Sequence, residues 1–130
     1  MSLALEESAV EQARANLRFR TQAFIAGTAV DAASGKTFAT ENPATGEELA
    51  LVAACDREDV DRAVAAARSS FESGTWSRIS PSDRKIVLLK FADLLEQHSA
   101  ELALLDALEA GKPITDCVTI DLPETIGCIR

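Results

Sequence analysis

The sequence lacks paired cysteines, has a single histidine and contains no long apolar run. Cys55, Cys117 and Cys128 are an odd, widely spaced set without a Cys-x-x-Cys motif, so no disulfide framework is expected. Three reduced thiols suit a cytoplasmic protein. His98 closes an apolar helical segment, where a surface or interfacial ring is a better interpretation than a proton shuttle. Because no run approaches the roughly 20 apolar residues of a membrane-spanning helix, no membrane partner is expected.

Basic residues are also scarce: 13 Lys and Arg stand against 21 Asp and Glu, which gives a net charge of −8. A phosphate backbone would be repelled on average, and no basic stripe with interleaved aromatic residues is present, so no nucleic-acid partner is expected. The first residues carry acids where a secretory signal would carry Lys or Arg, which again predicts the cytoplasm. With 47% apolar residues in 130, the chain has the size and composition of one globular domain.

The patterns predict an amino-terminal helical arm over residues 1–22, with its helix over 3–18. Residues 23–130 then form the main part, with strands over 23–53 and helices over 57–130. The strands are short and close together, as in an antiparallel, hairpin-rich arrangement. The fold class is therefore α/β: a small antiparallel strand set followed by long packed helices.

Local signals predict where several helices begin. Asp56 can cap the first, with Asp59 at the third position to reach back to the amide of the cap. Pro81 suits the first position of the next helix, and Ser99 can cap a further one.

Two segments of this helical part stand out. Residues 86–95 are apolar over more than one face, so this helix must be enclosed by other elements. Pro123 lacks a backbone donor and should kink or restart the last helix, in which no stop signal precedes Arg130.

Two motifs carry a resemblance to a known family. They are Asn42-Pro43-Ala44-Thr45-Gly46-Glu47 and, after the intervening helices, Glu109-Ala110-Gly111-Lys112-Pro113. Together they resemble the amino-terminal portion of the NAD(P)-dependent aldehyde dehydrogenases, from about Phe24 to Arg130. The resemblance implies an incomplete Rossmann-like domain. The stretch from Trp76 to Leu105 is similar to a bacterial branch that oxidises aminoaldehydes and gamma-glutamylamino-butyraldehyde from polyamine breakdown.

The resemblance implies oxidation of an aldehyde to a carboxylic acid with NAD or NADP, by an enzyme that is a homo-oligomer. In that family the nucleophilic cysteine, the general-base glutamate and the dinucleotide-binding motifs lie downstream, so residues 1–130 contain neither catalytic nor cofactor-binding residues. Cys55, Cys117 and Cys128 do not match the nucleophile in local context. The chain alone is expected to be inactive. An alternative is a stand-alone, non-catalytic helical module that binds a partner protein and derives from the same family.

Two sites of the family can be matched to residues here. The first is a monovalent-cation site for Na⁺ or K⁺, formed by the backbone carbonyls of Thr40 and Glu41 and by the side chain of Glu109. Hard oxygen ligands and a carboxylate suit such an ion. Many members carry Asp where this chain has Glu109, and the alternative is that Glu109 simply solvates a helix end.

The second matched site is the tunnel that receives the aldehyde, where Ile120, Asp121 and Glu124 fall at or near lining positions. Asp121 and Glu124 are three residues apart and can share a helix face. An ammonium about 4 Å from a carboxylate gains roughly 4 kcal/mol at an effective dielectric constant near 20, although desolvation offsets part of this. These residues predict a preference for aldehydes with a distal amine. The alternative is that both acids face water.

Overall fold

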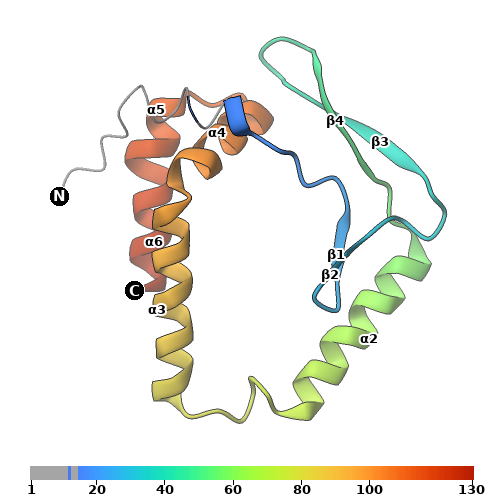
Figure 1. Cartoon of the computed structure of the whole chain (residues 1–130), viewed down its shortest axis with the longest axis vertical. Helices are drawn as coiled ribbons and strands as arrows, with labels where there is room; N and C mark the ends of the chain where they lie inside the picture. Colours follow the sequence, from blue (N-terminus) through green and yellow to red (C-terminus); the bar gives the residue numbers. More distant parts are fainter. Residues whose placement is uncertain (1–11, 13–14) are drawn as a thin grey trace. The chain divides into compact units, whose positions relative to one another are not determined.

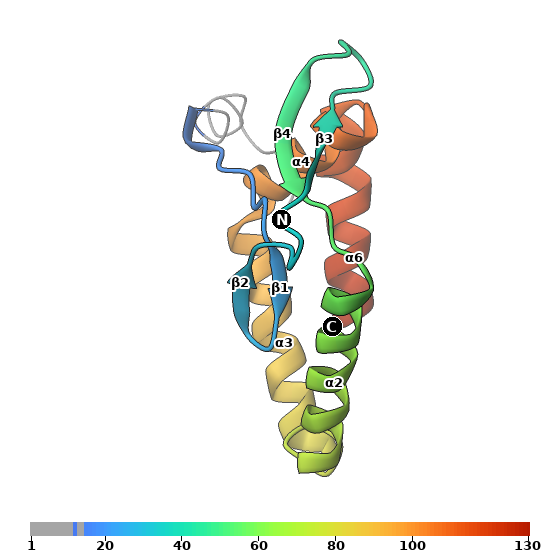
Figure 2. The same cartoon turned by 90° about the vertical axis from the view of Figure 1, so that its right-hand side faces the viewer.

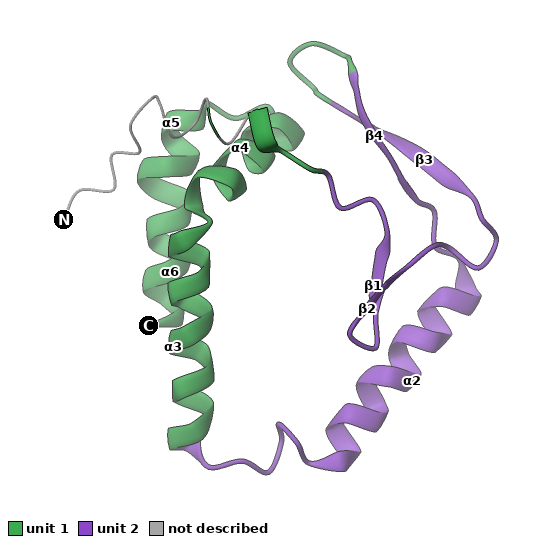
Figure 3. Cartoon of the chain, in the orientation of Figure 1, with its two compact units in different colours: residues 1–18, 42–47, 82–130 green, residues 19–41, 48–81 purple. Residues whose placement is uncertain are grey.

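The computed structural model describes residue 12 and residues 15–130 (Figure 1). These residues belong to two compact units (Figure 3): residues 1–18, 42–47 and 82–130 form unit 1, and residues 19–41 and 48–81 form unit 2. The predicted helix over 3–18 lies largely outside the described residues, and the predicted boundary at residue 22 stays a prediction. Within the described part, no helix is both long and apolar enough to cross a bilayer.

Unit 2 begins with the predicted short strands. β1 (Ala23–Ile25) pairs antiparallel with β2 (Thr28–Val30). The connecting residues Ala26 and Gly27 have φ angles of 53° and 83°. Positive φ at both central residues is the requirement of a two-residue type I′ hairpin turn, for which Gly27 is well suited.

The second pair of strands forms a longer hairpin. β3 (Thr37–Glu41) pairs antiparallel with β4 (Glu48–Ala53), from Thr37 opposite Ala53 to Glu41 opposite Glu48. The register shifts between Thr40 and Glu41, as in a β-bulge. The prediction of four short antiparallel strands is thereby confirmed.

The predicted Asn-Pro turn closes this second hairpin and belongs to unit 1. The Ala44 amide donates to the Asn42 side-chain Oδ1 at 2.9 Å. The Gly46 amide donates to the Asn42 carbonyl at 2.7 Å, and the Asn42 amide donates to the Glu47 carbonyl at 2.9 Å. Gly46 has a φ of 74°, which an L residue rarely adopts.

Helix α2 (Arg57–Ser73) completes unit 2 and has the predicted capping box. The Glu58 amide donates to Asp56, and the Asp56 amide donates to Asp59. Asp59 is only 1% exposed, because its carboxylate also accepts the Ala33 amide at 3.0 and 3.2 Å from its two oxygens. This single side chain therefore links the loop between the two hairpins to the start of the helix.

Unit 1 is helical. Helix α3 (Pro81–Gln97) begins at the predicted proline, and α4 (Ser99–Ala110) follows after one residue. The expected Ser99 cap is wrong: His98 holds the N-cap position, and Ser99 is the first helical residue. The reason is continuity of the backbone, since the His98 amide donates to Leu94 and the His98 carbonyl accepts from Leu102. No free helix end is left for a serine to cap.

The last segment contains three consecutive elements: α5 (Ile114–Asp116), the π-helical turn η1 (Cys117–Asp121) and α6 (Leu122–Ile129). The amide of Leu122 donates five residues back, to the Cys117 carbonyl, and Pro123 has no amide. The predicted restart at Pro123 is confirmed as this π turn followed by a new α-helix.

The core of unit 1 is small and lies where α4 meets η1. It consists of Ala103, Cys117 and Val118, with Ala107, Ile114 and Leu122 packed around it. Helices α3 and α6 lie side by side (Figures 1 and 2), and Arg130 donates to Asp93 at 2.9 Å and to Glu96 at 2.5 Å. These ion pairs attach the end of α6 to α3.

Candidate functional site

The two motifs that carried the family resemblance lie against each other within unit 1. Gly111 ends α4 in the left-handed conformation, with a φ of 68°. A Cβ atom at this position would lie 2.8 Å from Cγ of Pro43 in the Asn-Pro turn. Only glycine satisfies both the backbone conformation and this close approach, so the turn packs directly on the end of the helix.

The residue after Gly111 reaches the predicted tunnel helix. Lys112 Nζ makes an ion pair with Asp121 Oδ2, between side chains that are 41% and 33% exposed. The hydrogen bond to Asp121 raises the pKa of Lys112 above its usual value. No local spacing rule connects residues 112 and 121, and the sequence reasoning did not find this pair. Its consequence is that the Asp121 carboxylate already has a cation beside it.

Cys117 lies next to this ion pair and is fully buried. Burial raises the pKa of its thiol to about 11, and a hydrogen bond with Asp106 adds to this effect. The ligand atoms of Asp106, Cys117 and Asp121 lie within 4.8 Å of one another. A thiol that stays protonated at neutral pH, beside a carboxylate paired with lysine, suits neither a nucleophile nor a metal ligand set. Cys117 is a structural thiol.

The other two tunnel residues are open to solvent. Ile120 is 47% exposed, and Glu124 is exposed in the first turn of α6. Of the two predicted carboxylates, Glu124 is therefore the one that remains accessible. Their place in a substrate tunnel stays a prediction.

The predicted cation-site residues fall in both units. Thr40 and Glu41 flank the bulge in β3, where the ladder of hydrogen bonds is interrupted. Glu109 is exposed near the end of α4. Thr40 and Glu41 belong to unit 2 and Glu109 belongs to unit 1, so a shared Na⁺ or K⁺ site stays a prediction.

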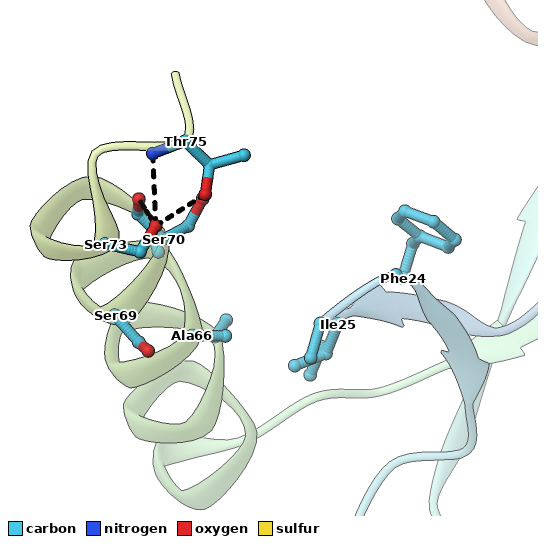
Figure 4. A pocket seen from close by; sticks show the side chains of 11 residues that line it. Phe24, Ile25, Ala66, Ser69, Ser70, Ser73 and Thr75 are labelled. Atoms are coloured by element: carbon cyan, nitrogen blue, oxygen red, sulfur yellow. Dashed lines mark hydrogen bonds between the residues drawn. The ribbon is translucent and has the colours of Figure 1, made fainter. Parts of the chain in front are cut away.

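A second hollow lies within unit 2, between the β1–β2 hairpin and α2 (Figure 4). This groove of about 700 Å³ has Phe24 and Ile25 on the hairpin side and Ala66 on the helix side. Hydroxyl groups gather toward the end of the helix, where Ser73 Oγ donates to the Ser70 carbonyl and lies 2.9 Å from the Thr75 hydroxyl. No residue lining the groove carries an acid, a base or a thiol, so the groove offers contact surface but no chemistry.

Comparison with known proteins gives consistent matches. The sequence profile described as "Aldehyde dehydrogenase family" matches residues 29–130. Aminoacetaldehyde dehydrogenase from Pseudomonas aeruginosa is 54% identical over 116 residues, which are 89% of this chain and 23% of that protein. A P. syringae indole-3-acetaldehyde dehydrogenase structure, in complex with NAD⁺, superposes with a TM-score of 0.87 at 48% identity, covering 92% of this chain and 24% of that one.

A second solved structure extends the agreement. The gamma-glutamyl-gamma-aminobutyraldehyde dehydrogenase from Burkholderia cenocepacia superposes with a TM-score of 0.87 at 42% identity, covering 98% of this chain and 25% of that one. The chain thus spans about a quarter of the length of the relatives it matches. The fold class predicted from the sequence, including the family resemblance, is confirmed. The match over residues 29–130 shows that this chain belongs to the aldehyde dehydrogenase family.

Proposed function

We propose that these residues are the amino-terminal part of an NAD(P)-dependent aldehyde dehydrogenase that oxidises aldehydes carrying a distal amine. The single observation that carries the substrate class is the difference between two carboxylates. Asp121 is paired with Lys112, whereas Glu124 is exposed on α6 beside the exposed Ile120. An apolar side chain next to an unpaired carboxylate suits an aldehyde with a hydrocarbon body and an ammonium end.

Two relatives support this substrate class by their names. One is an aminoacetaldehyde dehydrogenase, and the other acts on gamma-glutamyl-gamma-aminobutyraldehyde. Substrates of this kind arise in polyamine breakdown, as the resemblance implies. The reaction that we propose yields the carboxylic acid and transfers a hydride to the nicotinamide.

The residues described here do not fit the dinucleotide itself. The connection from β4 into α2 is the place where a strand leads into a helix, as in phosphate sites at helix N-termini. Here Asp56 caps the helix, and Glu58 and Asp59 occupy its first turn, so a phosphate would meet three carboxylates. The contribution that we propose for this chain is therefore to shape and charge the wall that receives the far end of the aldehyde. The reacting groups belong to the rest of the enzyme.

Other properties of the whole enzyme are proposed with less detail. NAD or NADP is the proposed cofactor, and relatives have been solved with NAD⁺. Three free thiols support a cytoplasmic location. Homo-oligomerisation and the Na⁺ or K⁺ site follow from the family resemblance, and no observation favours the alternative of a stand-alone interaction module.

The test uses a full-length hybrid, in which this chain replaces the matching residues of the P. aeruginosa relative. With Glu124→Gln, kcat/KM for 4-aminobutyraldehyde should fall about tenfold to hundredfold, which is about 1.4–2.8 kcal/mol left after desolvation. Butyraldehyde should change less than about twofold, because it has no ammonium. An equal change for both substrates would contradict the proposed substrate class. In the control Asp121→Asn, we expect both substrates to lose activity alike, since that carboxylate pairs with Lys112.

A further inference from the structure

One flank of α3 carries an uncovered apolar stripe. Val87, Phe91 and Leu94 follow one another at i, i+4 and i+7, and they are 49%, 49% and 52% exposed. This spacing places three large apolar side chains in one row along the helix. Within the same helix, Ala92 is 0% exposed. The helix therefore has a covered side and, next to it, an apolar stripe open to solvent.

The opposite flank of α3 provides a comparison. Lys90, Asp93 and Gln97 are all exposed there, and Asp93 is a partner of Arg130. Ile86 lies among these polar residues as an isolated apolar side chain, 51% exposed. Single exposed apolar residues are ordinary on protein surfaces, but a row of them marks an interaction surface. The stripe is thus distinct from the polar flank of the same helix.

The occupant follows from the length of the relatives. The superposed structures hold this chain's fold as about a quarter of a longer polypeptide, with a TM-score of 0.87 in two of them. The buried core of unit 1 is only a few side chains, which is too little to retain a stripe of this size without a cover.

We propose that the stripe Val87–Phe91–Leu94 is the surface on which the remaining three quarters of an aldehyde dehydrogenase polypeptide docks. This inference rests on the proposed function, because it takes the occupant to be that polypeptide. The apolar stripe is then an internal interface of the complete enzyme. Ile86 and the polar flank remain on its outside.

The test compares the 130-residue chain with the full-length hybrid defined above. Hydrogen exchange of the peptide spanning residues 87–94 should be at least tenfold slower in the hybrid. Phe91→Ser and Leu94→Ser should lower the melting temperature of the hybrid by several degrees. In the 130-residue chain, the same variants should leave the melting temperature unchanged and reduce binding of an apolar dye. The control Ile86→Ser should leave both proteins unchanged.

Several results would overturn the proposal. If the stripe variants destabilise the 130-residue chain as much as the hybrid, the stripe is already covered within the chain. If they abolish a concentration-dependent dimer of the 130-residue chain, a second copy is the occupant. A hybrid that does not fold, or shows no added protection at residues 87–94, also contradicts it. Aldehyde oxidation is a separate readout: a protected stripe in an inactive hybrid would contradict the proposed function alone.

Discussion

The two compact units each contain one fully buried polar or reactive side chain, and the two are held in opposite ways. In unit 2, the buried carboxylate of Asp59 accepts backbone amides from Ala33 and Asp56 and lies 3.5 Å from Arg62. In unit 1, the buried thiol of Cys117 lies in an apolar cluster. Unit 2 is therefore fixed by directional hydrogen bonds from a loop to a helix start, and unit 1 by contact among small apolar groups.

The difference teaches how short elements can be ordered without a large core. A charged acceptor with several donors gives strong, directional links, each worth about 1.5–3 kcal/mol. An apolar cluster gains mainly from the area removed from water, at about 25 cal/mol per Å². The first should fail abruptly when one group is removed, and the second gradually.

The largest effect is expected from removing the carboxylate of unit 2. Asp59→Ala leaves the amides of Ala33 and Asp56 without their acceptor and should destabilise unit 2 by about 3 kcal/mol. Fluorescence of Trp76, the single tryptophan, lies in unit 2 and can follow its unfolding in urea. Asp59→Asn retains one acceptor oxygen and should lose about half as much.

A surface variant of the same helix controls for loss of charge. Asp61 pairs with Arg57 at 3.8 Å, and both side chains are largely exposed. Asp61→Ala should therefore cost less than about 0.5 kcal/mol. If the two alanine variants had similar effects, unit 2 would not depend on the buried carboxylate. If hydrogen exchange in unit 1 fell in step with unit 2, the comparison of two separate units would itself be wrong.

A smaller effect is expected from the thiol of unit 1. Burial raises the pKa of Cys117 from 9.0 to about 11, so the folded state holds its proton more tightly than the unfolded state. Stability from this source is fully present below pH 9 and is lost as the pH rises toward 11. The free energy of unfolding should fall by at most about 1.4 kcal/mol per pH unit in that window. Circular dichroism during urea unfolding measures it.

The matched control is Cys117→Ala, whose unfolding free energy should lack this added pH dependence. A labelling experiment gives an independent readout: Cys55 and Cys128 are exposed and should react with a thiol reagent at pH 8, whereas buried Cys117 should not. Fast labelling of Cys117 in the folded protein would show that unit 1 lacks the closed cluster inferred here.

Local chemistry made much of the fold predictable. The capping box at Asp56 and Asp59, the glycine at the hairpin turn and the helix start at Pro81 all follow from backbone requirements within a few residues. The Ser99 cap failed because α3 and α4 share hydrogen bonds across His98, which a capping rule does not include.

The parts that could not be predicted depend on contacts between distant residues. Asp59 was expected only to reach back to its own cap, yet it also holds Ala33, 26 residues earlier. The pairing of Lys112 with Asp121 decides which tunnel carboxylate is accessible, but nothing in their spacing indicates it. Cys117 and Cys128 were placed on a similar face of a continuous helix, yet one is buried and the other exposed. The π turn of η1 contributes to this, because its extra residue per turn shifts the helical phase.

The smallest effects concern glycines of unit 1, and they separate close contact from backbone strain. Gly111→Ala should cost about 1–2 kcal/mol, since it meets both a φ of 68° and Cγ of Pro43 at 2.8 Å. Gly46→Ala meets a φ of 74° with nothing within 4 Å, so its smaller loss isolates the strain. Gly127→Ala, within α6 and in open space, should raise stability by about 0.5–1 kcal/mol. Equal losses for the first two variants would mean that the turn and the end of α4 do not pack together, and unit 1 would then rest on its apolar cluster alone.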